Sequence, residues 1–135
     1  MIHRHSIKVR FYELDPYNHL NHSAYVQYFE VGRIELLESI GFSLTRLQEL
    51  GCHLVVTRIK TRFLRPVGPH DELVVETGLG ELRRASSTWA QRLMRGDEEV
   101  ATQEVSFAAT DLAGKPRRFP EGLGDALQMV GGAGE

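Results

Sequence analysis

One long helical stretch, followed by four strand-like segments with no other long helix among them, limits this chain to few architectures. The helical pattern begins at Asn21 or Ser23 and runs to about Ile40, where Gly41 supplies a common helix stop. Apolar side chains occupy much more than one stripe of this helix, and its charges are confined to Glu30, Arg33, Glu35 and Glu38. We therefore expect a helix largely enclosed by other structure.

Alternation of apolar and polar residues predicts the strands around this helix. The expected strands are 6–13, 53–65, 72–82, 86–95 and 99–110, and short helices are expected at 43–50 and 121–130. Gly96 and Asp97 favour a tight hairpin between the last two strands, and Gly78 and Gly80 indicate a bend or bulge. Because no crossover helices separate the strands, the pattern predicts an α+β domain with an antiparallel sheet packed on one long helix.

The 135 residues fit one domain, 1–135, whose end from 128 to 135 is expected to be a flexible tail. A formal net charge of -2 gives no sign of nucleic-acid binding. The single cysteine, Cys52, excludes an internal disulfide and fits a cytoplasmic protein, and nothing nearby would activate it as a nucleophile. No apolar run approaches the roughly 20 residues of a membrane span, and no signal core is visible near Met1.

A polar loop stands directly ahead of the long helix. Its sequence is Asp15-Pro16-Tyr17-Asn18-His19-Leu20-Asn21-His22, which brings together a carboxylate, two histidines and two asparagines. The N-terminus of a helix presents N–H groups without intrahelical partners and favours negative charge. An acid, imidazoles and free amides together are suited to acyl chemistry, so the active site is expected here.

The segment from Val9 to Arg33 resembles hotdog-fold acyl-CoA thioesterases of the 4-hydroxybenzoyl-CoA thioesterase and YbgC-like group. That family has the pattern D-x-x-x-H-V-N-N-x-x-Y-x-x-Y-F-E-x-x-R, which Asp15 to Arg33 follows closely, and the likeness extends over about residues 6–120. The resemblance implies a five-stranded antiparallel sheet curled around the central helix. It also implies a homodimer or homotetramer with active sites between subunits.

By this resemblance, Asp15 is the catalytic carboxylate, acting as nucleophile on the thioester carbonyl or as general base for water. The backbone N–H of His22 would belong to the oxyanion hole, and its side chain could contact the substrate or position water. His19 could orient Asp15 or the loop. Simpler interpretations remain: Asp15 could form an Asx turn before Pro16, and both histidines could only fix the loop.

The candidate substrate-binding residues are Asn18, Tyr25, Arg83, Arg84 and Ser86. Asn18 replaces a glycine that is frequent in the family, and asparagine tolerates left-handed backbone angles. Asn21 is expected to cap the helix, Glu30 to be structural, and Tyr25 to pack while its hydroxyl could line an acyl pocket.

Coenzyme A carries phosphates, so cations are expected along an entry groove. The turn Arg83-Arg84-Ala85-Ser86 resembles the family's basic turn near the nucleotide, and the planar guanidinium of arginine suits phosphate oxygens. A second candidate is the stripe Arg58, Lys60 and Arg62 on one strand face. Either set could instead be an ordinary solvated surface.

The expected activity is hydrolysis of an acyl- or aroyl-thioester of coenzyme A or of an acyl carrier, without a metal or further cofactor. Three alternatives stay open. Asp15, His19 and His22 could bind a metal, although no further ligand cluster follows them. Hotdog folds also serve as hydratases and dehydratases, but the Asn-Pro order of the hydratase motif is missing here. A non-catalytic acyl- or acyl-carrier-binding module is the third.

Overall fold

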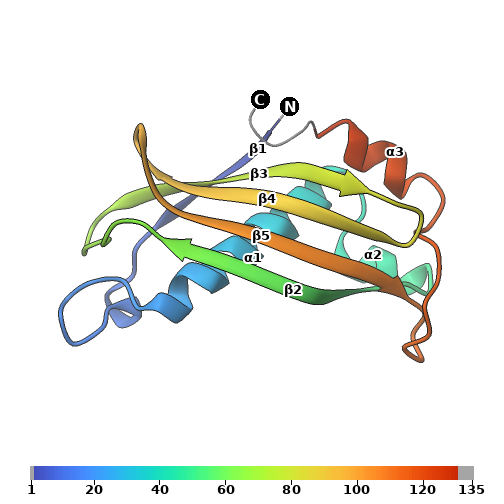
Figure 1. The fold of residues 1–135 in the computed structure, drawn as a ribbon, viewed down its shortest axis with the longest axis horizontal. Helices are drawn as coiled ribbons and strands as arrows, with labels where there is room; N and C mark the ends of the chain where they lie inside the picture. The colour runs from blue at the N-terminus through green and yellow to red at the C-terminus, as the bar shows by residue number, and fades with distance from the viewer. Residues whose placement is uncertain (1, 131–135) are drawn as a thin grey trace.

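The computed structural model describes residues 2–130 and contains one antiparallel sheet curled around one long helix (Figure 1). The strands are β1 (His3–Lys8), β2 (His53–Phe63), β3 (Glu72–Leu82), β4 (Ser86–Arg95) and β5 (Glu98–Thr110). They lie in the order β1-β3-β4-β5-β2, and every neighbouring pair is antiparallel. This confirms the expected α+β architecture with five strands.

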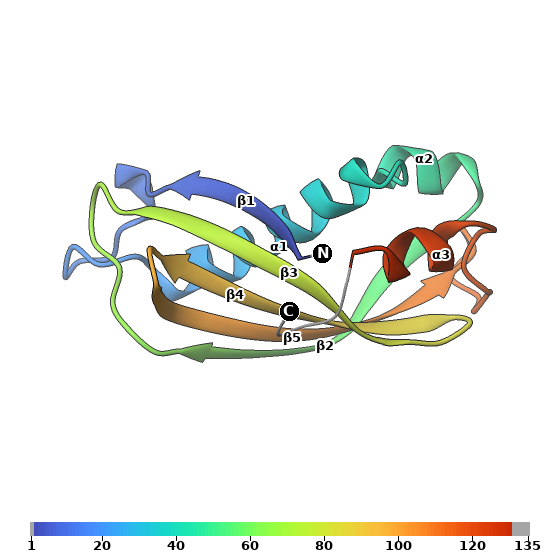
Figure 2. The same ribbon diagram turned by 90° about the horizontal axis from the view of Figure 1, so that it is seen from above.

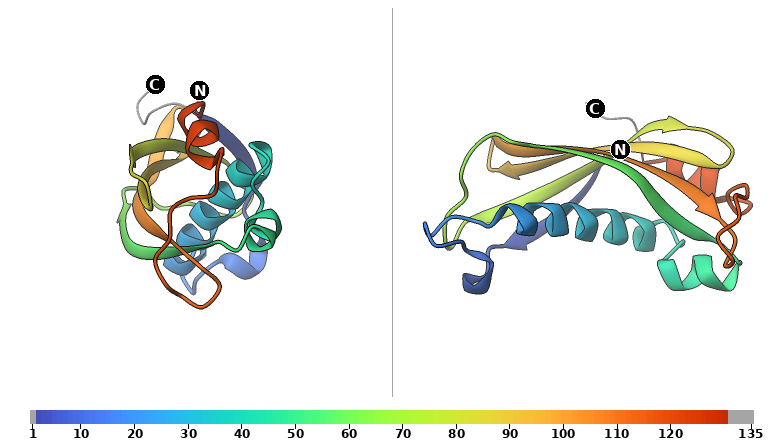
Figure 3. Two further views of the ribbon diagram at one scale, coloured as in Figure 1. Left: turned by 90° about the vertical axis from the view of Figure 1, so that its right-hand side faces the viewer. Right: turned by 60° about the horizontal axis from the view of Figure 1, so that its bottom comes forward.

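The long helix α1 (His22–Ser39) lies along the concave side of the sheet, as Figure 2 and the end-on view in Figure 3 show. Asn21 caps it, because its side-chain oxygen accepts from the Ser23 amide at 3.0 Å, and Gly41 follows its end with φ 83°. Two short helices, α2 (Leu44–Glu49) and α3 (Leu123–Gln128), lie at the far end of the sheet.

The first strand lies earlier than the sequence pattern predicted. β1 ends at Lys8, and Phe11–Glu13 forms a 3₁₀ turn instead of continuing the strand, with Phe11 85% exposed. The Glu13 carboxylate accepts from the Arg10 amide at 2.8 Å and so closes this turn locally. A local side-chain bond to the backbone thus overrode the alternating pattern.

The end of the chain had been expected to be a flexible tail from residue 128. The structure describes this stretch only as far as Val130, which is buried against the core, while Gln128 still belongs to α3. Residues 131–135 lie outside the described part of the chain.

The core consists of two apolar clusters with a polar layer between them. One cluster surrounds the first half of α1 and includes Tyr28, Phe29 and Leu93, and the other surrounds its second half and includes Leu36 and Trp89. The polar layer consists of the buried side chains of Arg33, Thr77, Gln91 and Gln103. Hydrogen bonds among these side chains offset part of the cost of burying them.

The helix is less enclosed than the wide spread of apolar residues around it predicted. Within one chain its outward face, including Glu30 and Val31, is exposed. The edge strand β2 is also open, and the exposed fractions of Val56, Ile59 and Phe63 are 45%, 43% and 50%. One side of the molecule therefore presents apolar surface along β2 and α1.

Candidate active site

The loop ahead of α1 is a closed hairpin built on Asp15. Leu14 and Leu20 form an isolated antiparallel bridge, and the Asp15 amide donates to the His19 carbonyl at 2.7 Å. Asn18 sits at the turn with φ 64°, the left-handed geometry that asparagine was expected to tolerate. The Leu20 amide donates to the Val67 carbonyl at 2.7 Å, which ties the hairpin to the segment after β2.

One oxygen of Asp15 holds this hairpin and the other is uncommitted. Its Oδ1 accepts from the backbone amides of Tyr17 at 2.9 Å and His19 at 3.1 Å. Among residues 2–130, no hydrogen bond uses Oδ2. The expected Asx turn is therefore present. Asp15 is half-buried, and the turn leaves its second carboxylate oxygen free for chemistry.

The same turn occurs a second time in the chain, around Asp111. Its Oδ1 accepts from the amides of Ala113 and Lys115, both at 2.9 Å, and its own amide donates to the Lys115 carbonyl at 2.7 Å. The turn alone therefore does not mark a site. What distinguishes Asp15 is that its hairpin leads directly into the N-terminus of the long helix.

His22 is the first residue of α1, and its N–H follows directly after this hairpin. The Asn21 side chain takes the Ser23 amide, and the Asn21 carbonyl takes the Ala24 amide at 2.9 Å. Within the described chain no acceptor pairs with the His22 N–H. A free amide at the positive end of a helix dipole can stabilise a developing oxyanion.

A clamp from α1 fixes the base of the hairpin. The Tyr28 hydroxyl donates to Glu13 Oε1 at 2.5 Å, and the Asn21 amide donates to the Glu13 carbonyl at 2.8 Å. Burial first, and then the Glu13 carboxylate, raise the pKa of Tyr28 well above its usual value, so its proton stays in this bond. The sequence alone did not reveal this contact. Glu13 lies just before the matched pattern, and Tyr28 lies within it.

The side chains of His19 and His22 are exposed, and neither forms a hydrogen bond within residues 2–130. The contact of His19 with Asp15 comes from its backbone N–H, not from its ring. Tyr25 is buried, and its hydroxyl donates to the Arg65 carbonyl at 3.1 Å, so the structure gives it a packing role. Over the described residues, no group of three His, Cys, Asp or Glu side chains is placed to hold a metal.

Comparison with known proteins identifies the family of this chain. Residues 9–127 match the thioesterase-like superfamily. The chain belongs to this family. Its fold is the hotdog fold of the thioesterase structures that it resembles, and it is a thioester hydrolase by class.

Two relatives and one solved structure illustrate the family. The acyl-CoA thioesterase YbgC of Haemophilus influenzae is 30% identical over 117 residues, which are 85% of this chain and 86% of the relative. The acyl-acyl carrier protein thioesterase ATL3 of Arabidopsis thaliana is 35% identical over 91 residues, 67% of this chain but only 45% of the relative. A probable thioesterase from Bartonella henselae has a crystal structure with TM-score 0.85 and 29% identity, covering 89% of this chain and all of that one (100%).

In this thioesterase chain the predicted phosphate-binding turn lies far from Asp15. Arg83, Arg84 and Ser86 lie at the β3–β4 end of the sheet, opposite the end that carries the hairpin (Figure 1). β3 alone spans roughly 33 Å at 3.3 Å per residue. Arg83 pairs with Glu81 at 2.8 Å on the surface. One chain therefore does not bring these residues to the hairpin.

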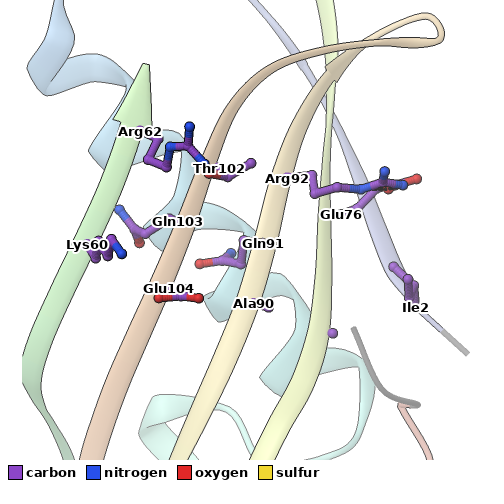
Figure 4. Close-up of a pocket in the computed structure, with 11 residues that line it drawn as sticks. Ile2, Lys60, Arg62, Glu76, Ala90, Gln91, Arg92, Thr102, Gln103 and Glu104 are labelled. Carbon is purple, nitrogen blue, oxygen red and sulfur yellow. Dashed lines mark hydrogen bonds and ion pairs between the residues drawn. The ribbon is translucent and has the colours of Figure 1, made fainter. Parts of the chain in front are cut away.

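The second cationic candidate, on the outer face of the sheet, borders a hollow of about 320 Å³ (Figure 4). Its cations are interspersed with acids: Lys60 stands opposite Glu104, and Arg92 contacts Glu76 at 2.5 Å. Arg92 and Arg4 lower the pKa of Glu76 against the opposing effect of its burial, so this carboxylate stays ionised. The mixed charge favours a solvated face over a phosphate site.

No helix within residues 2–130 is long and apolar enough to cross a membrane. Cys52 is fully buried, and burial raises the pKa of its thiol, which does not favour a nucleophilic role.

Proposed function

We propose that this chain hydrolyses an acyl- or aroyl-CoA thioester to the free acid and coenzyme A, with no further cofactor. The observation that carries the proposal is the uncommitted Oδ2 of Asp15, on a hairpin that leads directly into the free amide of His22 at the start of α1. The His22 N–H would stabilise the tetrahedral oxyanion. Asp15 would attack the thioester carbonyl as a nucleophile, or take a proton from the attacking water.

The family relationship supports hydrolysis over the hydratase and binding-module alternatives, because the relatives described above are named as thioesterases. Their names include both coenzyme A and acyl carrier protein as the thiol component. Both thiol components present a thioester on a flexible arm, and the proposed chemistry at Asp15 is the same for each.

The decisive variant is Asp15→Asn. Asparagine keeps an oxygen that can accept from Tyr17 and His19, so the hairpin stays closed while the charge is removed. We expect the rate of thiol release from acyl-CoA to fall by about 10²- to 10⁴-fold, the range for losing a general base or nucleophile. Enoyl-CoA turnover without thiol release would indicate a hydratase, and binding without turnover would indicate a module.

Asp111→Asn is the matched control, because Asp111 makes the same turn at the other end of the molecule. The control should leave thiol release within about twofold of the native protein. An equal loss of rate in both variants would show that the turn, not the chemistry of Asp15, matters for activity.

We further propose that the active enzyme is a homodimer, or a tetramer of such dimers, formed through β2. An unpaired edge strand of 11 residues with exposed apolar side chains needs covering. Antiparallel pairing of β2 with its copy would place the His53 end of one chain beside the Phe63 end of the other. The Arg83–Ser86 turn of one chain would then approach the Asp15 end of its partner, where it could bind coenzyme A phosphates.

Sedimentation at micromolar concentration tests this arrangement. Ile59→Lys places a charge at the centre of the exposed strand, where its 43% exposure in the single chain avoids a folding defect. We expect the native protein to sediment as an oligomer, and the Ile59→Lys variant to dissociate and lose activity. A native protein that is monomeric yet active would contradict an interfacial site.

A further inference from the structure

A cavity of about 210 Å³ lies between the middle of α1 and the β2 side of the sheet, on the far side of the polar layer from the Asp15 hairpin. Its wall is mainly apolar and includes Ile34, Leu37, Leu44, Leu54, Val56 and Phe107. Small-molecule sites are built in this way, from an apolar hollow with a few polar groups. At this size the cavity accepts part of a ligand, not a whole coenzyme A thioester.

Arg33 supplies a buried charge to this wall. Its side chain is 8% exposed, and its Nη1 donates to Gln91 Oε1 at 2.9 Å and to Gln103 Oε1 at 2.6 Å. Both acceptors are neutral amides. Throughout the described residues no carboxylate forms an ion pair with Arg33, and Nε and Nη2 make no hydrogen bond.

Two further neighbours line the cavity. Trp89 is 3% exposed, and its indole N–H is sealed from solvent and has no partner among residues 2–130. Glu30 lines the same cavity but is exposed to solvent. Burial lowers the pKa of Arg33, and the charge of Glu30 opposes that effect without direct contact.

A buried arginine remains protonated at neutral pH, and a buried charge is normally paired. The planar fork of a guanidinium matches the two oxygens of a carboxylate. We propose that this cavity binds the carboxylate of an organic acid with an apolar body, held by the Arg33 guanidinium. For an acid that enters through the cavity, the apolar wall takes the hydrocarbon part.

Such a carboxylate has two possible sources. Arg33 lies 11 positions after His22, about 16 Å along α1 at 1.5 Å per residue, which an extended chain of about twelve carbons covers. One source is therefore the distal carboxylate of an acyl group whose thioester lies at His22, and this source rests on the proposed function. The other is a free acid that binds alone.

Trp89 allows a direct test, because it is the only tryptophan of the chain. Titration with octanoate should change its fluorescence saturably, whereas 1-octanol should not. Arg33→Gln keeps a donor for the two glutamines but removes the charge, and should weaken octanoate binding at least about tenfold. Glu30→Gln removes a repelling charge and should strengthen binding by about two- to fivefold.

Val56→Phe fills the cavity from β2 and should abolish the fluorescence change without touching the polar layer, so it tests the site even if Arg33→Gln does not fold. Because β2 is also the proposed dimer strand, the variant is compared with the native protein only where both sediment as the same species. Equal responses to octanoate and 1-octanol, or binding unchanged in Arg33→Gln or Val56→Phe, would overturn the proposal. The proposal would also be overturned if octanoate gave no saturable fluorescence change and Arg33→Gln affected the hydrolysis of the two thioesters described below equally.

Hydrolysis of dodecanedioyl-CoA and dodecanoyl-CoA distinguishes the two sources. If the distal carboxylate is the ligand, Arg33→Gln should lower kcat/KM at least about tenfold more for dodecanedioyl-CoA than for dodecanoyl-CoA. If a free acid is the ligand, octanoate binds but Arg33→Gln affects both thioesters equally. Failure of either thioester to be hydrolysed would count against the proposed function only, because the fluorescence titration needs no turnover.

Discussion

Gly32 lets α1 lie close against the sheet, and Gly32→Ala tests how this contact sets the position of the helix. A Cβ built on Gly32 would lie 2.5 Å from Val75 Cγ1 and 3.2 Å from both Gln91 Nε2 and Thr77 Oγ1. Real Cβ atoms essentially never approach another heavy atom within 3.0 Å, so the Val75 side chain, the helix or the sheet must move.

The expected cost follows from opposing terms. Overpacking of a buried site costs about 1–3 kcal/mol, and disturbing the Gln91 hydrogen bonds adds about 1 kcal/mol. Alanine gains about 1 kcal/mol over glycine in a helix interior. We therefore expect Gly32→Ala to lower the free energy of unfolding by about 1–3 kcal/mol in urea denaturation, at matched protein concentration.

Gly124→Ala in α3 is the matched control, because its Cβ would meet only Leu82 Cδ2, at an ordinary 3.8 Å. It should be neutral or stabilising by up to about 1 kcal/mol. Val75→Ala removes the clashing methyl group, so it should cost less in the Gly32→Ala background than alone. Gly32→Ala as stable as the native protein, or no coupling to Val75, would refute the reasoning.

Two further predictions concern the ties around the hairpin. Tyr28→Phe removes the hydroxyl that holds Glu13. We expect kcat to fall more than KM rises, and the free energy of unfolding to fall by about 1–3 kcal/mol. An unchanged kcat would show that the bond between Tyr28 and Glu13 does not position Asp15. The Gly68 amide and Arg95 lower the pKa of Asp71 in the folded protein below its usual value of 3.8. The ionised Asp71 carboxylate therefore stabilises the fold above pH 3.8. This contribution is lost as the pH falls through the folded-state pKa. Asp71→Asn should therefore lower stability by about 1 kcal/mol at pH 7, and the difference should shrink as the pH of a denaturation series falls through the folded-state pKa of Asp71. A difference independent of pH would contradict an ionic origin.

Much of the fold was predictable because local patterns and tertiary packing agree in this chain. The bounds of β3 and β4, the Asn21 cap and the Gly96 hairpin all follow from residue types whose preferences are local. β1 is the exception, since the bond from the Arg10 amide to Glu13 cannot be read from alternation alone.

The sequence by itself determined the succession of strands along the chain, the long helix and the polar loop ahead of it, because hydrophobic period, capping residues and the Asp15 to Arg33 pattern are all local. Only the tertiary structure decided what surrounds them. It showed that Arg83 lies at the opposite end from Asp15, that Tyr28 clamps Glu13, and that Arg33 is buried against Gln91 and Gln103 without a counter-charge. These contacts join residues distant in sequence, and the curl of the sheet around α1 alone brings them together.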